Sequence, residues 1–179
     1  RATAEKVYEL IFSDMTYAAQ NLPEKWANPA DKGRGTSLAA WAFLGRFYLQ
    51  AGKAAEASAA LDNVIGKFRL YDNYADIFDP AKKNEEVENI FEIQFKHSGA
   101  WGLEGSLQHS YWGPRGVGGP TFGGGWGGFG ASQYLYDSYD ANDKRREAFF
   151  CTEFLGVPQN PPCIMKFIDP EFGNQIEDD

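Results

Sequence analysis

The first third of the chain has hydrophobic residues at helical spacing in three successive segments. Apolar residues recur every three or four positions over residues 4–21, and Pro23 ends the run. Thr36 is a good N-cap for a second helix, expected over residues 37–51. The pattern then predicts a third helix over residues 54–68. The second helix is apolar nearly all round, so it must be covered on more than one side.

The rest of the chain predicts shorter elements. Residues 71–84 have the character of an irregular connection, and alternating apolar side chains over residues 89–95 predict a short strand. A short helix is expected to begin near Ser132, with interior side chains at Tyr134, Leu135 and Tyr139.

A hairpin and both cysteines are predicted in the C-terminal region. Apolar runs at residues 148–154 and 163–168 predict two strands joined by a loop that contains Pro158, Pro161 and Pro162. Cys151 and Cys163 are expected to be two buried free thiols, and a disulfide in an oxidising compartment is the alternative. There is no Cys-x-x-Cys, and both histidines are distant in sequence, so we expect no metal and no other cofactor.

The second and third helical segments together contain a repeat signature. It is the tetratricopeptide (TPR) pattern W-x-x-L-G-x-x-Y followed by a small and a large apolar residue, here Trp41, Leu44, Gly45, Tyr48, Ala57 and Leu61. Gly45 has no side chain, so the paired helix can approach closely. Arg69 departs from the pattern, because it stands where the consensus has Pro. About three repeats are normally needed for stability. We therefore expect a fragment of a longer helical protein, unless other parts of this chain cover the open faces.

These patterns predict a mainly α fold. We expect TPR-type helix pairs of an α-α superhelix, together with a loop-rich region and a few short β-strands. The expected organisation is a TPR-like helical part at residues 1–70 and a loop-rich part at residues 71–179, within a single domain.

Composition narrows the class of protein. Of the 179 residues, 16% are aromatic, which excludes disorder for most of the chain. Seventeen Lys and Arg against 25 Asp and Glu give a net charge of −8, the opposite of what nucleic-acid binding requires. No apolar run reaches the roughly 18 residues of a membrane span.

Thirteen of the 20 glycines lie between Gly99 and Gly130, with aromatic residues spread among them. Aromatic faces beside amide or guanidinium groups suit a sugar ring, whose C–H groups stack while its hydroxyls are hydrogen-bonded. The predicted ligand contacts are the aromatic Trp101, Tyr111 and Trp112 and the polar Gln108 and Arg115. The alternative is a glycine-rich loop that its own aromatic side chains pin to the core.

Catalytic chemistry has little support in this segment. A glycosidase needs two carboxylates facing across a site, and between Gly99 and Gly130 the sequence offers Glu104 alone. No serine lies in a G-x-S-x-G elbow, and the glycine runs lack the Lys-Ser/Thr of a phosphate loop. We therefore expect no catalytic residues and no enzyme activity.

Several short stretches occur in a specific order along nearly the whole chain. They are residues 7–22, 33–49, 54–64, 73–78 (NYADIF), 88–95 (ENIFEIQF), 125–127 with 133–139, 143–146 (DKRR) and 163–169 (CIMKFID). Each stretch alone is a weak signal. Their combination resembles the SusD/RagB-like proteins of Gram-negative glycan-uptake systems.

The resemblance implies a surface lipoprotein of the outer membrane, built on several TPR helix pairs, that binds oligosaccharide or polysaccharide without catalysis. It implies a SusC-like TonB-dependent transporter as partner, no nucleic acid, and membrane attachment only through a lipid anchor. That anchor and the signal are expected outside this chain. Trp126 lies in a stretch shared across the family and is interpreted as structural first. Asp143 and Arg145 are interpreted as a local capping or salt-bridge pair.

The alternative function is a TPR interaction module that holds a peptide or a partner protein in its groove. Grooves that bind acidic peptide ends usually carry Lys, Arg or Asn on the inner helix face, whereas the second helix offers only Arg46 and Gln50. Buried loop aromatics without an exposed cluster would favour this alternative.

Overall fold

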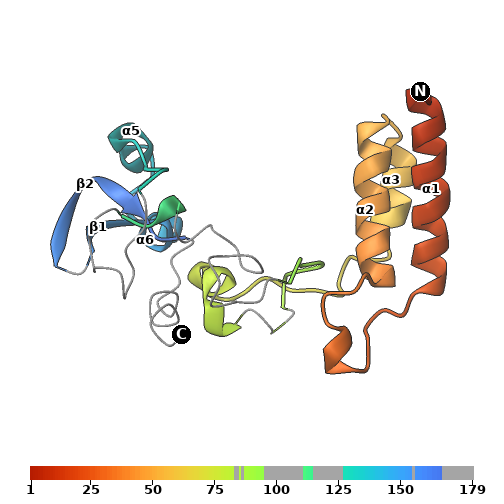
Figure 1. Cartoon of the computed structure of the whole chain (residues 1–179), viewed down its shortest axis with the longest axis horizontal. Coiled ribbons are helices and arrows are strands. Elements are labelled where there is room, and N and C mark those ends of the chain that lie inside the picture. The colour runs from red at the N-terminus through yellow and green to blue at the C-terminus, as the bar shows by residue number, and fades with distance from the viewer. Residues whose placement is uncertain (83–84, 86, 95–110, 115–126, 155, 167–179) are drawn as a thin grey trace. The chain divides into compact units, whose positions relative to one another are not determined.

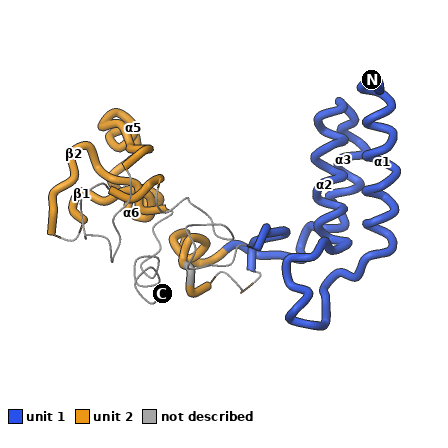
Figure 2. Tube along the Cα trace, in the orientation of Figure 1, with its two compact units in different colours: residues 1–70, 86–94 blue, residues 71–85, 95–179 orange. Residues whose placement is uncertain are grey.

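The computed structural model describes residues 1–82, 85, 87–94, 111–114, 127–154 and 156–166. The chain divides into two compact units (Figure 2). Unit 1 comprises Arg1–Leu70 and Glu86–Gln94, and unit 2 comprises Tyr71–Glu85 and Phe95–Asp179. The predicted mainly α fold with a few short strands is confirmed.

Three helices lie side by side in unit 1: α1 (Ala4–Asn21), α2 (Ser37–Gln50) and α3 (Ala54–Leu61) (Figure 1). Helix α2 contacts both α1 and α3, as its nearly all-round apolar surface predicts. The side chain of Thr36 accepts a hydrogen bond from the Ala39 amide at 3.2 Å, which confirms the predicted N-cap. The first two helices are therefore where the sequence predicts them.

The third helix is shorter than predicted, because it ends at Leu61 instead of reaching residue 68. Directly after this end, the side-chain amide of Asn63 donates to the carbonyls of Ala59 and Ala60 at 3.0 and 3.2 Å. Tight turns follow, and Gly66 has a φ of 80°, in the left-handed region. These local bonds compete with continuation of the helix, which hydrophobic spacing alone does not reveal.

Helices α2 and α3 approach each other at Gly45. A Cβ atom at this position would lie 2.6 Å from Cγ and 2.7 Å from Cδ2 of Leu61. Leu44 and Ala57 beside this crossing are buried. The predicted close approach at Gly45 is confirmed, and the side chain that fills the space is that of Leu61.

Replacing Gly45 by Ala is expected to destabilise unit 1 by up to about 2 kcal/mol. Overpacking against Leu61 costs about 1–3 kcal/mol, and the better helix propensity of Ala offsets about 1 kcal/mol of it. Urea unfolding followed by far-UV circular dichroism measures the change. In a Leu61→Ala background the same substitution should lose its cost and become neutral or stabilising. An equal cost in both backgrounds would contradict the steric explanation.

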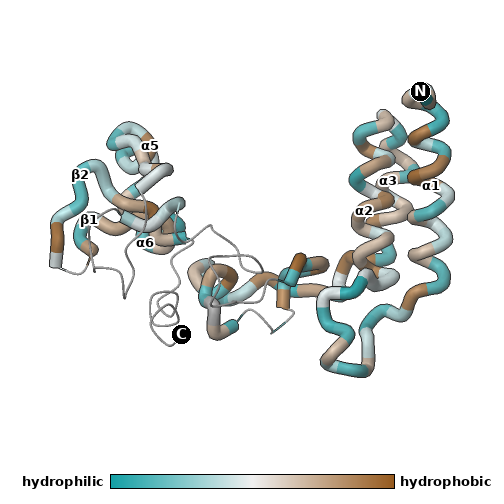
Figure 3. Tube along the Cα trace, viewed as in Figure 1, coloured by the Kyte–Doolittle hydropathy of each residue, from teal (hydrophilic) through white to brown (hydrophobic). Residues whose placement is uncertain are grey.

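Some apolar residues of unit 1 are exposed. On α1 the exposed apolar or aromatic side chains recur at helical spacing; they are Val7, Leu10 and Tyr17. Hydrophobic and hydrophilic stretches alternate along this helix (Figure 3). TPR helices normally bury such faces against neighbouring repeats. The described residues leave this face of α1 in contact with solvent.

Residues 87–94 pack against the helices of unit 1 without forming a strand. The Arg69 amide donates to the Val87 carbonyl at 3.2 Å, and the Phe91 ring lies edge-on to Phe43 at 5.8 Å. The strand predicted for residues 89–95 is therefore wrong over the described residues 89–94. The alternating residues do not share a buried face: Phe91 packs on Phe43 of α2 although it is 41% exposed, and Ile93, two positions on, is 71% exposed.

Unit 2 contains short elements. They are the 3-10 helices η2 (Tyr74–Phe78) and η3 (Pro80–Lys82), the helices α5 (Gln133–Asp137) and α6 (Lys144–Phe149), and the strands β1 (Phe150–Phe154) and β2 (Val157–Ile164). The connection predicted as irregular thus contains two 3-10 helices, and α6 was not predicted. Helix α5 follows the N-cap Ser132, as expected.

The interior positions predicted for the α5 region are only partly correct. Tyr134 is 85% exposed and Leu135 is exposed as well. Tyr139 instead packs edge-on against Phe150 at 5.5 Å. Helix α5 has only five residues, which is too short for helical spacing alone to select the buried face.

Strands β1 and β2 form an antiparallel hairpin. The predicted hairpin is confirmed, but the three prolines lie within β2 instead of in the connecting loop. Phe154 pairs with Val157, so the chain reverses between them, and Gly156 there has a φ of 78°. Among the described residues this sheet has only two strands, so each is an edge strand, where missing proline amides are tolerated.

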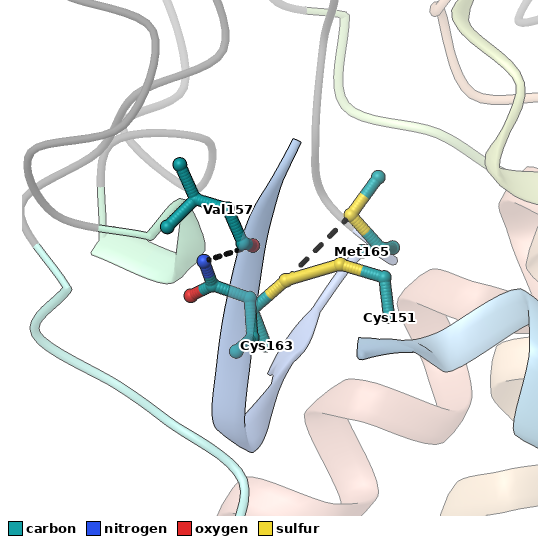
Figure 4. The surroundings of a disulfide bond; sticks show 5 residues. Cys151, Val157, Cys163 and Met165 are labelled. Carbon is teal, nitrogen blue, oxygen red and sulfur yellow. Dashed lines mark hydrogen bonds between the residues drawn. A yellow bond between two sulfur atoms is a disulfide. The ribbon is translucent and has the colours of Figure 1, made fainter. Parts of the chain in front are cut away.

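Cys151 and Cys163 form a disulfide between the two strands (Figure 4). They are register partners in the hairpin, with Cα atoms 5.4 Å apart, a normal separation for a disulfide. Met165 Sδ lies 4.0 Å from Cys163 Sγ, and Phe154 belongs to the same small apolar cluster. The expectation of two free thiols is therefore wrong, because hairpin pairing places the two side chains directly opposite each other.

Candidate functional site

Two of the five predicted ligand-binding residues, Tyr111 and Trp112, lie in the described part of unit 2, and both contact the ring of Phe129. The ring centroids of Tyr111 and Phe129 are 5.6 Å apart, and those of Trp112 and Phe129 are 5.1 Å apart. These three residues are called the three-ring cluster below. Trp101, Gln108 and Arg115 lie outside the described residues, as does Trp126.

The backbone brings the two segments of the three-ring cluster together. The Phe129 amide donates to the Tyr111 carbonyl at 3.1 Å, and the Gly127 amide donates to the Gly113 carbonyl at 3.0 Å. Residue numbers fall along one segment as they rise along the other, so the two segments run in opposite directions. Main-chain bonds therefore hold Phe129 beside Tyr111.

Glycines permit this close pairing. Gly127 has a φ of 62°, in the left-handed region that other residues rarely adopt. A Cβ atom on Gly128 would lie 3.5 Å from Cδ1 of Tyr111 and 3.6 Å from its carbonyl oxygen, which is ordinary van der Waals contact. Of these two glycines, Gly127 is therefore the one that the backbone requires.

The rings of the three-ring cluster are partly open to solvent. Phe129 is 52% exposed, Tyr111 is 38% exposed, and Trp112 is half-buried. The ring planes of Tyr111 and Trp112 are tilted by 48° and 40° from that of Phe129. The cluster is an angular apolar surface with polar atoms on two of its three side chains, and it can stack against a ligand that has apolar faces.

Phe129 is not among the predicted ligand contacts. Its position between glycines in the same aromatic segment is the signal that could have found it. Phe129 pairs with Tyr111, which is distant in the sequence, and no sequence pattern predicts this tertiary contact.

A second aromatic cluster in unit 2 was not predicted. It joins η2, α6, β1 and the end of the α5 region through edge-on and tilted rings of Tyr74, Phe78, Tyr136, Tyr139, Phe149 and Phe150. Cations lie over several rings, including the guanidinium of Arg146 4.1 Å from the Tyr136 centroid. These rings are buried or half-buried, so this cluster serves as a core of unit 2.

The charged groups of unit 2 with shifted pKa values belong to local pairs. The Asp143 carboxylate accepts from the Arg145 side chain at 3.0 Å and from the Arg145 backbone amide at 2.9 Å. These bonds lower the pKa of Asp143, and they confirm the predicted capping and salt-bridge pair. The bond to Asp76 raises the pKa of Lys82, and burial together with Glu85 raises the pKa of Tyr71.

Within the part of the chain that the structure describes, no helix is both long and apolar enough to cross a membrane. The same residues contain no group of three His, Cys, Asp or Glu side chains that could hold a metal ion. In this part of the chain, the three-ring cluster is the surface feature that matches the chemistry predicted from the sequence.

Fold and site together define a mainly α protein with TPR-type helix packing and an exposed aromatic cluster held by glycine-rich backbone. A family model for SusD-like proteins, described as "Starch-binding associating with outer membrane", matches residues 1–49. A curated SusD-like protein of Bacteroides ovatus is 31% identical over 110 residues, which cover 54% of this chain and 19% of that protein.

Solved structures with a similar fold include surface glycan-binding and SusD-like proteins. Surface glycan-binding protein A from Bacteroides thetaiotaomicron, in complex with laminarihexaose, matches with a TM-score of 0.76 at 20% identity, over 97% of this chain and 44% of that chain. A SusD-like protein from Bacteroides fragilis matches with a TM-score of 0.59 at 25% identity, over 78% of this chain and 27% of that one. The chain is thus SusD-like in its N-terminal sequence and in its fold, and it spans about a fifth of the curated relative's length.

Proposed function

We propose that this chain is part of a cell-surface protein that binds oligosaccharide or polysaccharide without cleaving it, with the three-ring cluster as a contact surface. The observation that carries the proposal is the partly exposed cluster of Tyr111, Trp112 and Phe129. The likeness to SusD-like proteins supports the same ligand class, since one structural relative was solved with laminarihexaose.

Aromatic rings suit a sugar because the two surfaces are alike in their polarity. A pyranose presents C–H groups on its faces and hydroxyls at its rim, and an aromatic ring offers a flat apolar face of similar size. The Tyr111 hydroxyl and the Trp112 indole N–H add polar atoms at the edge of the apolar surface. Trp101, Gln108 and Arg115 are proposed as further contacts on the same chemical grounds.

We also propose the cellular setting. The family is described as associated with the outer membrane, and we place this chain in a surface lipoprotein whose signal and lipid anchor lie outside it. The bound glycan is proposed to pass to a SusC-like TonB-dependent transporter. The disulfide between Cys151 and Cys163 supports maturation in an oxidising compartment outside the cytoplasm.

Replacing Trp112 by Ala is expected to weaken glycan binding by about tenfold. An aromatic contact is worth about 0.5–1.5 kcal/mol beyond the area it buries, and about 1.4 kcal/mol corresponds to a factor of ten in affinity. Isothermal titration calorimetry with laminarihexaose, maltohexaose and cellohexaose measures the change. Tyr134→Ala is the matched control, because Tyr134 is an exposed aromatic residue of unit 2 that is not in the three-ring cluster.

Equal affinities for wild type, Trp112→Ala and Tyr134→Ala would exclude the three-ring cluster as the binding surface. A hexasaccharide shortened during incubation with the purified protein would contradict the proposed absence of catalysis.

A further inference from the structure

We infer that Phe129 has a second role in the proposed glycan site as a positioning residue: besides any contact of its own exposed ring, it fixes the orientations of Tyr111 and Trp112 and acts on the ligand mainly through them. The inference rests on the proposed function for the identity of the ligand. The role of Phe129 itself follows from the geometry of the three rings.

Tyr111 and Trp112 are consecutive residues in helical conformation. The side chains of consecutive helical residues leave the axis about 100° apart. A ring that contacts both therefore links two different directions, and Phe129 brings such a ring from another segment.

Among the described aromatic residues, Phe129 is the one whose ring contacts both Tyr111 and Trp112. Its plane is tilted by 48° from one ring and by 40° from the other. A ring in this place restricts rotation of both neighbours about their side-chain bonds. A site whose side chains are already ordered binds more tightly, because less conformational entropy is lost on binding.

The backbone, and not the Phe129 side chain, joins the two segments. The amide of Phe129 bonds to the Tyr111 carbonyl, and the amide of Gly127 bonds to the Gly113 carbonyl. Both bonds remain when the ring is removed. With about half of its surface exposed, Phe129 also contributes little to core burial. Phe129→Ala should therefore fold, with its effect concentrated on the orientation of the two neighbouring rings.

The first test measures affinity for laminarihexaose by calorimetry. Phe129→Ala is expected to bind about five- to tenfold more weakly than wild type, whereas Phe129→Tyr, which keeps the ring, should stay within about twofold. In a Trp112→Ala background, Phe129→Ala should have a clearly smaller effect, because one of the rings that it orients is gone. If the two effects multiply independently, Phe129 does not act through Trp112, and the inference is overturned.

The second test needs no ligand. The protein is labelled with 5-fluorotryptophan, and the Trp112 resonance is assigned by its absence in Trp112→Phe. Phe129→Ala should shift or broaden this fluorine resonance, while Phe129→Tyr should largely restore it. A Trp112 resonance that is unchanged in Phe129→Ala overturns the inference. Thermal unfolding of each variant checks that the fold is kept.

The two tests separate this inference from the proposed function. If Tyr111→Ala and Trp112→Ala weaken binding but Phe129→Ala changes neither affinity nor the Trp112 resonance, the glycan site stands and the positioning role fails. If Phe129→Ala changes the resonance while every cluster variant binds as wild type does, the proposed function of the cluster fails and the positioning of Trp112 stands as a structural role only.

Discussion

Leu44→Ala is expected to destabilise the three-helix unit by about 2–5 kcal/mol. Leu44 is 2% exposed and is the largest fully buried side chain among the described residues. It belongs to α2, the helix that contacts both α1 and α3. Truncation removes buried methyl groups and leaves a cavity that fixed neighbouring backbone cannot fill. The loss is a large fraction of the roughly 5–15 kcal/mol that stabilises a typical native protein.

Leu49→Ala is the matched control for this prediction. Both residues are leucines of α2, so the change in helix propensity is the same. Leu49 is 57% exposed, and its truncation is expected to change stability by about 0.5 kcal/mol or less. Urea unfolding followed by far-UV circular dichroism reports mainly on the helices of unit 1. Similar unfolding midpoints for the two variants would show that Leu44 is not in the core of this unit.

The sequence predicts the helices of unit 1 well because their determinants are local. Apolar spacing defines α1. The start of α2 is marked by Thr36, which accepts its capping hydrogen bond from Ala39, only three residues away. Gly45 is also readable, since a glycine in a TPR-type pattern indicates a close helix crossing and the Leu61 side chain occupies that space. The end of α3 is missed because it depends on side-chain bonds from Asn63, which compete with the helix.

The predictions that fail depend on partners distant in the sequence. An alternating segment becomes a strand only if another strand pairs with it, and residues 89–94 pack through Phe91 on Phe43 instead. The prolines suggest a loop because they lack a backbone donor, but an edge strand tolerates them. Reading residues 157–164 as an edge strand requires knowing that only one strand pairs with them, and that partner lies outside the segment.

The candidate site also combines residues that the local sequence identifies with one that depends on a distant partner. Chemistry alone selects Tyr111 and Trp112, since aromatic rings in a charge-poor segment suit an apolar ligand face. Phe129 joins them only through backbone pairing of residues 111–113 with 127–129. That pairing uses Gly127 in the left-handed region, a role that becomes visible once the two segments lie together.

Whether the two cysteines bond to each other depends on the register of the hairpin. The hairpin and the two cysteines are both apparent in the sequence, but the register of the hairpin is not. A shift by one residue would place the cysteines on opposite faces, whereas the observed register puts Cys151 directly across from Cys163. With the register known, the disulfide follows from the short distance between their Cα atoms.

Replacing both cysteines by alanine is expected to destabilise the β1–β2 hairpin by about 2–4 kcal/mol. The disulfide joins residues 12 positions apart, and closing a loop of this size restricts the unfolded chain by about 3 kcal/mol. Alanine is the suitable replacement, because Cys163 is buried and a serine hydroxyl there would need a hydrogen-bond partner. Hydrogen exchange of residues 150–164, measured by mass spectrometry, reports on the hairpin directly. Helices α1 to α3 of unit 1 should exchange as in wild type.

Reductant provides the matched control. Dithiothreitol should speed hydrogen exchange in the wild-type hairpin to about the level of the Cys151→Ala/Cys163→Ala variant, and it should leave the variant itself unchanged. The variant lacks the cysteine side chains with and without dithiothreitol, whereas reduced wild type keeps them and lacks only the crosslink. Equal exchange in these two samples would therefore assign the loss of stability to the crosslink. Alkylation of unreduced, denatured protein purified from an oxidising compartment tests the disulfide itself. If both cysteines are alkylated, the disulfide is absent and the two strands are held by their backbone pairing alone.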